Sequence, residues 1–228
     1  MARMLITGAS RGIGLALNRA ALEGGWDVIA LARDVTSLEL SALLSGDSGA
    51  RLTLIPCDVT DARSVHAARA ACRLEALDVI VNNAGVSCGP QRAPGFDFEI
   101  TNRLLATNTV GPLRIYDAFV DLLRLGDSPR LLNISSEAGS LGRFRKSGKL
   151  DYAMSKAALN AFTLWAAAEE KGMIVVSVDP GWTQTETGGS GASYTPEQTA
   201  GRLLKCVESL TPAASGGFFT AELSPIPF

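Results

Sequence analysis

Short apolar runs alternate along the chain with longer segments in which apolar residues recur every three or four positions. The short runs have the length of buried strands, and the longer segments have the period of amphipathic helices. Strands that are apolar throughout are typical of a sheet covered on both faces, and strand–helix alternation implies parallel strands with right-handed crossovers. We therefore expect one α/β domain over residues 1–228, with a doubly wound parallel sheet between two layers of helices. The expected strands span 3–7, 27–31, 51–56, 77–82, 130–134, 173–178 and 217–220, and the expected helices 12–23, 38–44, 61–73, 98–125, 150–171 and 196–210.

Three loop-like segments follow expected strands, at 85–95, 139–148 and 181–193. In an open α/β sheet, the carboxyl ends of the parallel strands meet at one edge, and ligands bind there. The pattern therefore predicts a functional site at this edge of the sheet.

Composition and charge narrow the class of partner. The chain has 228 residues, with 21 Lys and Arg against 23 Asp and Glu, so its formal net charge is −2. This balance leaves no basic field to attract nucleic acid or an anionic membrane. No apolar run approaches the roughly 18 residues of a membrane helix, and the first run is too short for a signal peptide. We expect a cytoplasmic protein.

Histidine and cysteine usage argues against a metal centre. His66 is the single histidine, which excludes a multi-histidine site, and it is expected at the surface, away from every motif. The cysteines, Cys57, Cys72, Cys88 and Cys206, form no CxxC pair. A chain of this size buries a sufficient core without disulfides or metals, so these cysteines are interpreted as reduced thiols.

Residues 7–14 read TGASRGIG and lie between the first expected strand and the first expected helix. Glycines here let the backbone approach a pyrophosphate, and the helix N-terminus adds free N–H groups and a partial positive charge. The spacing is GxxxGxG, not the GxGxxG of the common dinucleotide fingerprint. The segment favours a nucleotide site, with a ligand-free glycine turn as the alternative.

The end of the second expected strand favours NADP over NAD. Ala32 stands where an acidic residue would hold the ribose hydroxyls of NAD, and Arg33 follows it, 19 residues after Gly14. Arg11, in the glycine loop, is a second candidate to bind the 2′-phosphate of NADP. Alternatively, Arg33 is a solvated loop charge.

Tyr152 and Lys156 are four positions apart and share one face of an expected helix. A tyrosine has a pKa of about 10, and a nearby ammonium favours the phenolate and lowers that pKa. Such a pair can exchange a proton with a carbonyl oxygen, although a YxxxK spacing also arises by chance. Ser135 and Ser136, just past the fifth expected strand, either hydrogen-bond the same oxygen or are ordinary turn serines.

Together these motifs resemble the short-chain dehydrogenase/reductase family over nearly the whole chain and in the same order. The resemblance implies a Rossmann-type fold with NADP(H) laid across the strand ends, NAD(H) being less favoured. It implies cofactor contacts from Tyr152 and Lys156 and from five segments. These are the glycine loop (Gly8, Ser10, Arg11, Gly12, Ile13 and Gly14), Arg33, the adenine segment (Asp58 and Val59), the NNAG segment (Asn83, Ala84 and Gly85) and the PG segment beside the nicotinamide (Pro180, Gly181, Thr183 and Thr185).

The resemblance also implies a reaction site of Asn108, Ser136, Tyr152 and Lys156. Hydride would pass between nicotinamide and a carbonyl or alcohol carbon while Tyr152 handles the proton of the oxygen. Ser136, which fits the family pattern better than Ser135, would hydrogen-bond that oxygen. Lys156 would bind the nicotinamide ribose and lower the pKa of Tyr152, and Asn108 would hold a water leading to solvent.

Finer features resemble the C-factor or sniffer-like branch of the family, which includes carbonyl reductases and a bacterial cell–cell signalling protein. These features are the segment 32–36 (ARDVT), the GW pair after Pro180 and the tail segment 215–219 (SGGFF). Membership of the family implies a homodimer or homotetramer, and a monomer is also compatible with the sequence.

Two departures from the family pattern concern the substrate. The gap from Ser136 to Tyr152 is 16 residues, longer than usual, and its extra residues fall in a basic loop, 143–149, which either binds an anionic substrate or is solvated. The segment at about 181–195 is too short for a large helical lid. We expect a short substrate loop there, over an open, shallow site.

The leading interpretation is therefore an NADP-dependent carbonyl reductase or alcohol dehydrogenase acting on a small molecule. The alternative is a signalling or regulatory protein on the same scaffold, in which nucleotide binding matters more than turnover. The intact set Asn108, Ser136, Tyr152 and Lys156 favours the enzyme, because a binding protein does not need all four.

Overall fold

The computed structural model describes residues 2–46, 48–92, 94–144 and 149–228. Its strands are β1 (Arg3–Thr7), β2 (Asp27–Ala32), β3 (Leu52–Pro56), β4 (Val79–Asn82), β5 (Arg130–Ile134), β6 (Ile174–Asp179) and β7 (Phe218–Thr220). They form one parallel sheet in the order β3-β2-β1-β4-β5-β6-β7. The expected doubly wound α/β architecture is confirmed.

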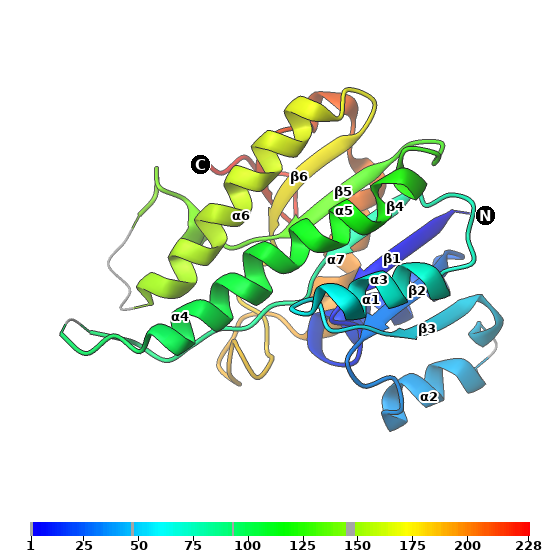
Figure 1. Cartoon of the computed structure of the whole chain (residues 1–228), viewed down its shortest axis with the longest axis horizontal. Helices are drawn as coiled ribbons and strands as arrows, with labels where there is room; N and C mark the ends of the chain where they lie inside the picture. Colours follow the sequence, from blue (N-terminus) through cyan, green and yellow to red (C-terminus); the bar gives the residue numbers. More distant parts are fainter. Residues whose placement is uncertain (1, 47, 93, 145–148) are drawn as a thin grey trace.

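Helices cover both faces of this sheet (Figure 1). They are α1 (Gly12–Glu23), α2 (Leu38–Ser45), α3 (Ala62–Ala71), α4 (Phe98–Leu105), α5 (Gly111–Leu123), α6 (Leu150–Glu169) and α7 (Pro196–Ser209). Helices α3, α5 and α6 lie over one face, and α1 and α7 lie over the other. The loops that follow β4, β5 and β6 gather at the same edge, where the functional site was expected.

The sheet has an apolar core on each face, and alternate residues of each strand point into one core or the other. Met4 and Ile6 belong to the cluster that packs against α1 and α7, whereas Leu5 between them belongs to the cluster under α5. Neighbouring side chains on a strand point to opposite faces, so a strand buried on both sides must be apolar throughout. Each fully buried aliphatic side chain contributes about 1.5–3 kcal/mol relative to an exposed one.

Helix starts follow the local chemistry. Thr195 and Gln198 form a capping box at the start of α7, with Thr195 Oγ1 accepting from Gln198 N at 3.2 Å and Gln198 Oε1 accepting from Thr195 N at 2.9 Å. Pro196 follows at the first helical position, where its missing N–H costs nothing. Helix α7 therefore starts at the residue predicted from the sequence.

The predicted helix over 98–125 contains an irregular turn. Helix α4 ends at Leu105, a π-helical turn covers Ala106–Val110, and α5 continues from Gly111 to Leu123. Pro112, which has no N–H to donate, follows directly after the π turn, where the helical hydrogen-bond pattern is already irregular. The π turn carries Asn108, which is buried.

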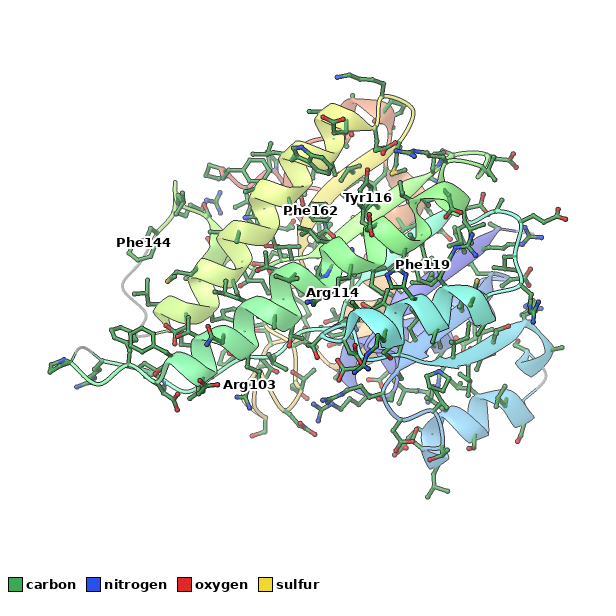
Figure 2. The ribbon with its side chains drawn as sticks, viewed as in Figure 1. Arg103, Arg114, Tyr116, Phe119, Phe144 and Phe162 are labelled. Atoms are coloured by element: carbon green, nitrogen blue, oxygen red, sulfur yellow. The ribbon has the colours of Figure 1, made fainter. Side chains whose placement is uncertain are left out.

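Helices α5 and α6 pack through aromatic rings. Tyr116 of α5 and Phe162 of α6 meet edge to face, with ring centroids 5.5 Å apart (Figure 2). Trp165 of α6 contacts both rings, yet its side chain is 54% exposed on the outer surface. The layer of α5 and α6 therefore has an apolar outer face.

Other sequence-based expectations concern single residues. His66 is exposed, as expected, and Cys57, Cys72 and Cys206 are buried free thiols, whereas Cys88 is half-buried. The described ranges contain no helix long and apolar enough to cross a membrane.

Candidate active site

A cleft of about 1050 Å³ opens at the carboxyl edge of the sheet. Every residue expected to bind cofactor lines it except Gly14. These lining residues are Gly8, Ser10, Arg11, Gly12, Ile13, Arg33, Asp58, Val59, Asn83, Ala84, Gly85, Tyr152, Lys156, Pro180, Gly181, Thr183 and Thr185. Ser136 lines the cleft as well, while Asn108 lies beneath its surface.

The glycine loop fills the turn from β1 to α1. Gly8 has a φ of +66°, and a Cβ there would lie 2.8 Å from Ala84 Cα, so only glycine fits this position. Gly14 has a packing role, since its Cα closes against the carbonyl of Gly8. Within the described residues, α1 starts without a capping side chain or an acidic residue in its first turn. Its leading N–H groups can therefore receive an anion.

The NNAG segment fastens the glycine loop to the sheet. Thr7 Oγ1 accepts hydrogen bonds from Asn83 N and Ala84 N, each at 3.0 Å, and Asn83 Nδ2 donates to Thr7 O at 2.9 Å. On the other side, Asn18 Nδ2 donates to Ala9 O at 2.9 Å. The loop is thus held by β4 and by α1, independently of any ligand.

Two arginines stand at the end of the cleft expected to take the nucleotide. Arg33 is exposed beside Asp58, while Arg11 forms an ion pair with Glu186 from the loop after β6. Burial alone would raise the pKa of the Asp58 carboxyl, but hydrogen bonds from Thr60 and the nearby Arg33 and Arg114 bring that pKa below its usual value. Asp58 therefore remains an anionic hydrogen-bond acceptor at neutral pH.

Tyr152 and Lys156 project from α6 toward the segment after β5. The Ser136 side chain is close enough to the Tyr152 hydroxyl to lower its pKa, and Ser136 Oγ accepts from Ala138 N at 3.2 Å. Lys156 Nζ donates to Ile134 O at 2.7 Å and lies 5.8 Å from the centre of the Tyr152 ring. Ser135 faces elsewhere, because its hydroxyl donates to Asn160 Oδ1 at 2.7 Å. The structure thus brings Ser136, Tyr152 and Lys156 together and leaves Ser135 in a supporting position.

Burial controls the protonation of this cluster. It raises the pKa of Tyr152 to about 12, although the Ser136 side chain acts in the opposite direction. It lowers the pKa of Lys156 to about 8, against the effect of the nearby Asp179 carboxylate. The lowered Tyr152 pKa expected from the sequence is therefore wrong for this structure, because desolvation outweighs the effect of Ser136 and the Asp179 carboxylate raises the pKa further.

Asn108 is committed to protein contacts through its side chain. Its Oδ1 accepts from Val86 N at 2.8 Å, and its Nδ2 donates to Val86 O at 2.9 Å and to Ser155 Oγ at 3.0 Å. A Cβ on Gly85 would lie 3.5 Å from Asn108 Oδ1 and 3.8 Å from Lys156 Nζ, which places Gly85 between the two residues. Both Nδ2 hydrogens of Asn108 are therefore used, so any water held by Asn108 would have to donate to one of its oxygens.

The loop after β6 is short and internally hydrogen-bonded. Gln184 N donates to Tyr194 O at 2.8 Å, and Tyr194 N donates to Trp182 O at 3.1 Å. The Thr183 and Thr199 hydroxyls are hydrogen-bonded at 2.8 Å, which fastens the loop to α7. Thr185 lies against Gly12 of the glycine loop. The loop therefore extends to the glycine-loop end of the cleft, and it is too short to form a large lid over the cleft.

Some lining residues escaped the sequence analysis. Asp179, at the end of β6, and Glu186 line the cleft but belong to no motif of the sequence. Arg103, which projects from α4, also lines the cleft (Figure 2). Of the basic loop 143–149, Arg143 pairs with Glu137 at 3.2 Å, Phe144 is exposed and Lys149 lines the cleft, whereas 145–148 lie outside the described residues.

The comparison with protein families agrees with this geometry. The family model described as short chain dehydrogenase matches residues 2–193. The chain belongs to the short-chain dehydrogenase family. It is accordingly an oxidoreductase of this type, with the Rossmann-like fold that the sequence resemblance implied.

Individual relatives place this short-chain dehydrogenase near the C-factor and sniffer-like branch. It is 35% identical over 155 residues to the C-signal of Myxococcus xanthus, covering 67% of this chain and 93% of that protein. The carbonyl reductase Sniffer of Drosophila melanogaster superposes with a TM-score of 0.93 at 26% identity, covering all of both chains. The NADPH-bound carbonyl reductase from chicken fatty liver gives a TM-score of 0.88 at 29% identity, covering 99% of this chain and 98% of that one.

Proposed function

We propose that this short-chain dehydrogenase is an NADP(H)-dependent carbonyl reductase acting on small carbonyl and alcohol compounds. The observation that carries the proposal is the Ser136–Tyr152–Lys156 cluster, set in the same cleft as the uncapped N-terminus of α1. The two carbonyl reductases of similar fold, one of them NADPH-bound, support the same assignment.

The residues present fit a phosphorylated dinucleotide. The free N–H groups at Gly12, Ile13 and Gly14 suit a pyrophosphate, and Arg11 and Arg33 supply cations for a 2′-phosphate. Asp58, Val59, Asn83, Ala84 and Gly85 would hold the adenosine and the centre of the cofactor, and Pro180, Gly181, Thr183 and Thr185 the nicotinamide amide. When bound, NADPH supplies the hydride.

The protein's own task is to handle the proton. Because burial keeps Tyr152 protonated at neutral pH, its hydroxyl is ready to donate a proton to a substrate oxygen as negative charge develops there. Ser136, which lies beside that hydroxyl, would donate a second hydrogen bond to the same oxygen. This protonation state favours reduction of a carbonyl over oxidation of an alcohol.

Lys156 and Asn108 would support the same step. The remaining N–H groups of Lys156 would bind the ribose hydroxyls of the cofactor beside Tyr152. Asn108 would hold, through one of its oxygens, a water that returns a proton from solvent by way of Lys156.

The substrate would enter beside the short loop at about 181–195. The loop is short and internally hydrogen-bonded, it meets the glycine loop through Thr185 and Glu186, and Trp182 is 59% exposed. A small carbonyl compound therefore suits the site better than a bulky, fully enclosed one. The cytoplasmic location stays a prediction.

The apolar outer face of α5 and α6 would form a subunit interface. Leu113, Phe162 and Trp165 line a groove on this face with almost no polar surface. We infer a homodimer or homotetramer built on it, and size-exclusion chromatography of the wild-type protein and Trp165→Asp tests this, since a monomer in both would contradict the inference.

The similarity to C-signal leaves a signalling role as the competing function. A signalling protein would need the nucleotide site but not the complete proton-handling cluster. Titration with NADPH and NADH, followed by nucleotide fluorescence, and then a panel of aldehydes and ketones tests the proposal. We expect tight NADPH binding, weaker NADH binding and turnover. Binding without turnover of any carbonyl would favour the signalling role, and binding of neither nucleotide would contradict both.

A further inference from the structure

Asp179, the last residue of β6, makes two short hydrogen bonds with one carboxylate. Its Oδ2 accepts from Glu137 N at 2.6 Å, and its Oδ1 accepts from Gly181 N at 2.6 Å. The side chain is half-buried and lines the active-site cleft. Hydrogen bonds to an ionised acceptor are stronger than those between neutral groups.

The two donors belong to the two loops that carry the reaction site. Glu137 directly follows Ser136, whose side chain lowers the pKa of Tyr152. Gly181 directly follows Pro180, in the loop assigned to the nicotinamide. Strands β5 and β6 pair only as far as Ile134 and Val178, with one further bond from Ser135 N to Val178 O at 2.8 Å. Beyond that point, the Asp179 carboxylate takes over the connection between the two chain segments.

A second group fixes the same loop from the opposite side. Arg202 of α7 donates from Nη1 to Pro180 O at 3.0 Å and lies 3.9 Å from the centre of the Tyr194 ring. Gly181 has a φ of +80°, and a Cβ there would meet the Tyr194 ring at 3.1 Å. The loop is therefore held at two neighbouring backbone groups, the Pro180 carbonyl and the Gly181 N–H.

The charges that face Asp179 come from three elements. Arg202 faces it from α7 and is paired with Glu222, Lys156 and Tyr152 face it from α6, and Glu137, from the turn after β5, is itself paired with Arg143. The carboxylate raises the pKa of both Tyr152 and Lys156. Its charge therefore reaches the reacting groups, as well as the two loops.

We propose that Asp179 is a positioning residue of the reaction, whose carboxylate joins the Ser136 loop to the Pro180–Gly181 loop and sets the Ser136 hydroxyl against the nicotinamide site. This proposal rests on the function proposed above. Reaction rates are sensitive to misplacement of about 1 Å, so a loose connection costs turnover before it costs cofactor affinity.

The first test is Asp179→Asn. An amide has one acceptor oxygen, so one of the two N–H groups loses its partner and faces an NH₂ group instead. We expect kcat for carbonyl reduction to fall about 10- to 100-fold, with the NADPH dissociation constant within about threefold of wild type. Loss of the negative charge also lowers the pKa of Tyr152, which must be protonated for reduction. The alkaline limb of the pH profile of kcat/KM should therefore move to lower pH.

A second variant removes the same bond from the donor side. Glu137→Pro deletes the N–H of residue 137 and keeps the Asp179 carboxylate that accepts from it. Proline suits the first position of a 3₁₀ turn that follows extended Ser136, with φ −163° and ψ 147°. Glu137→Ala, which keeps the N–H, is its matched control. We expect Glu137→Pro to lower kcat about 10-fold without moving the pH profile, and Glu137→Ala to stay near wild type. Asp61→Asn, at the exposed cap of α3, controls for loss of a carboxylate that caps a backbone N–H.

A readout independent of turnover separates this proposal from the proposed function. Amide hydrogen exchange of the segments around Glu137 and Gly181 should speed up in Asp179→Asn and not in Asp61→Asn. If the wild-type protein reduces no carbonyl but both segments loosen in the variant, the connection stands and the reaction assignment falls. Unchanged exchange in both segments, or wild-type kcat and pH profile in Asp179→Asn, overturns the proposal. If that variant does not fold, equal activity of Glu137→Pro and Glu137→Ala overturns it.

Discussion

The two ends of the cleft are built in different ways. At the glycine-loop end, contacts run between short contiguous motifs: Thr7 binds Asn83 and Ala84, and Asn18 binds Ala9. At the reaction end, the groups come from the ends of β5 and β6, from α6 and from the π turn, and the central pair is a buried lysine beside a half-buried tyrosine.

The difference separates a site made by backbone shape from a site made by side-chain charge. The glycine-loop end offers N–H groups and exposed arginines. The reaction end keeps a cation and a phenol out of water, which destabilises their charged forms. Changes at the first end should therefore act on cofactor affinity, and changes at the second on turnover and stability.

The largest expected effect is at the reaction end. Tyr152→Phe removes the proton donor and keeps the ring, so turnover should fall about 10²- to 10⁴-fold while NADPH affinity changes little. Steady-state kinetics and a nucleotide fluorescence titration measure the two quantities. A variant with wild-type turnover would remove Tyr152 from the mechanism.

Arg33→Ala is the corresponding test at the cofactor end. A charge-assisted bond to the 2′-phosphate contributes about 1.5–3 kcal/mol, so the NADPH dissociation constant should rise about 10- to 100-fold. The NADH constant should stay nearly unchanged, since NADH lacks this phosphate. Equal weakening of both nucleotides in the same titration would show that Arg33 does not read the phosphate.

The buried lysine predicts a stability cost that depends on pH. Its folded-state pKa of about 8 lies below its ordinary value, so the unfolded chain binds the proton more tightly. The resulting cost is complete below pH 8 and fades as pH rises toward about 10.5. Lys156→Met should therefore be more stable than wild type at pH 7 by about 1–2 kcal/mol, after the lost hydrogen bond to Ile134 is counted.

Urea unfolding of both proteins at several pH values measures this cost. The advantage of Lys156→Met should shrink between pH 8 and about 10. An advantage that is absent at pH 7, or constant across this range, would contradict the assignment of the cost to the buried charge. Lys156→Met should also lose turnover, so the same residue would lower the stability of the fold and be required for activity.

The smallest expected effect concerns the ion pair between Arg11 and Glu186. Both side chains are exposed, and exposed pairs contribute about 0–1 kcal/mol. Glu186→Gln frees Arg11 for the 2′-phosphate, so the NADPH dissociation constant should fall by at most about threefold, with NADH unaffected. Weaker NADPH binding in this variant would mean that Glu186 supports the site instead of competing for Arg11.

The same division explains what the sequence could predict. The strands, the glycine loop and the Tyr152–Lys156 pair follow from local periodicity and contiguous motifs, and the structure contains each of them. Asp179 was missed because its partners are the backbone N–H groups of Glu137 and Gly181, which leave no mark on residue types. The π turn was missed because one extra residue shifts the apolar phase only once, which the residue spacing over 98–125 alone does not distinguish from a continuous helix. The raised pKa of Tyr152 was missed because desolvation depends on the packed surroundings.

The strand order has a consequence for how the protein is made. Strand β1 lies inside the sheet, β2 and β3 are added outward on one side, and β4, β5, β6 and β7 follow one another outward on the other. Each strand that leaves the ribosome therefore finds a free edge, and none has to be inserted between strands already paired. The glycine loop and the NNAG segment are synthesised well before Tyr152 and Asp179. This topology allows a nascent chain to form its nucleotide cradle first, so that a bound dinucleotide can stabilise the half-made domain while the residues that do the chemistry are still to come.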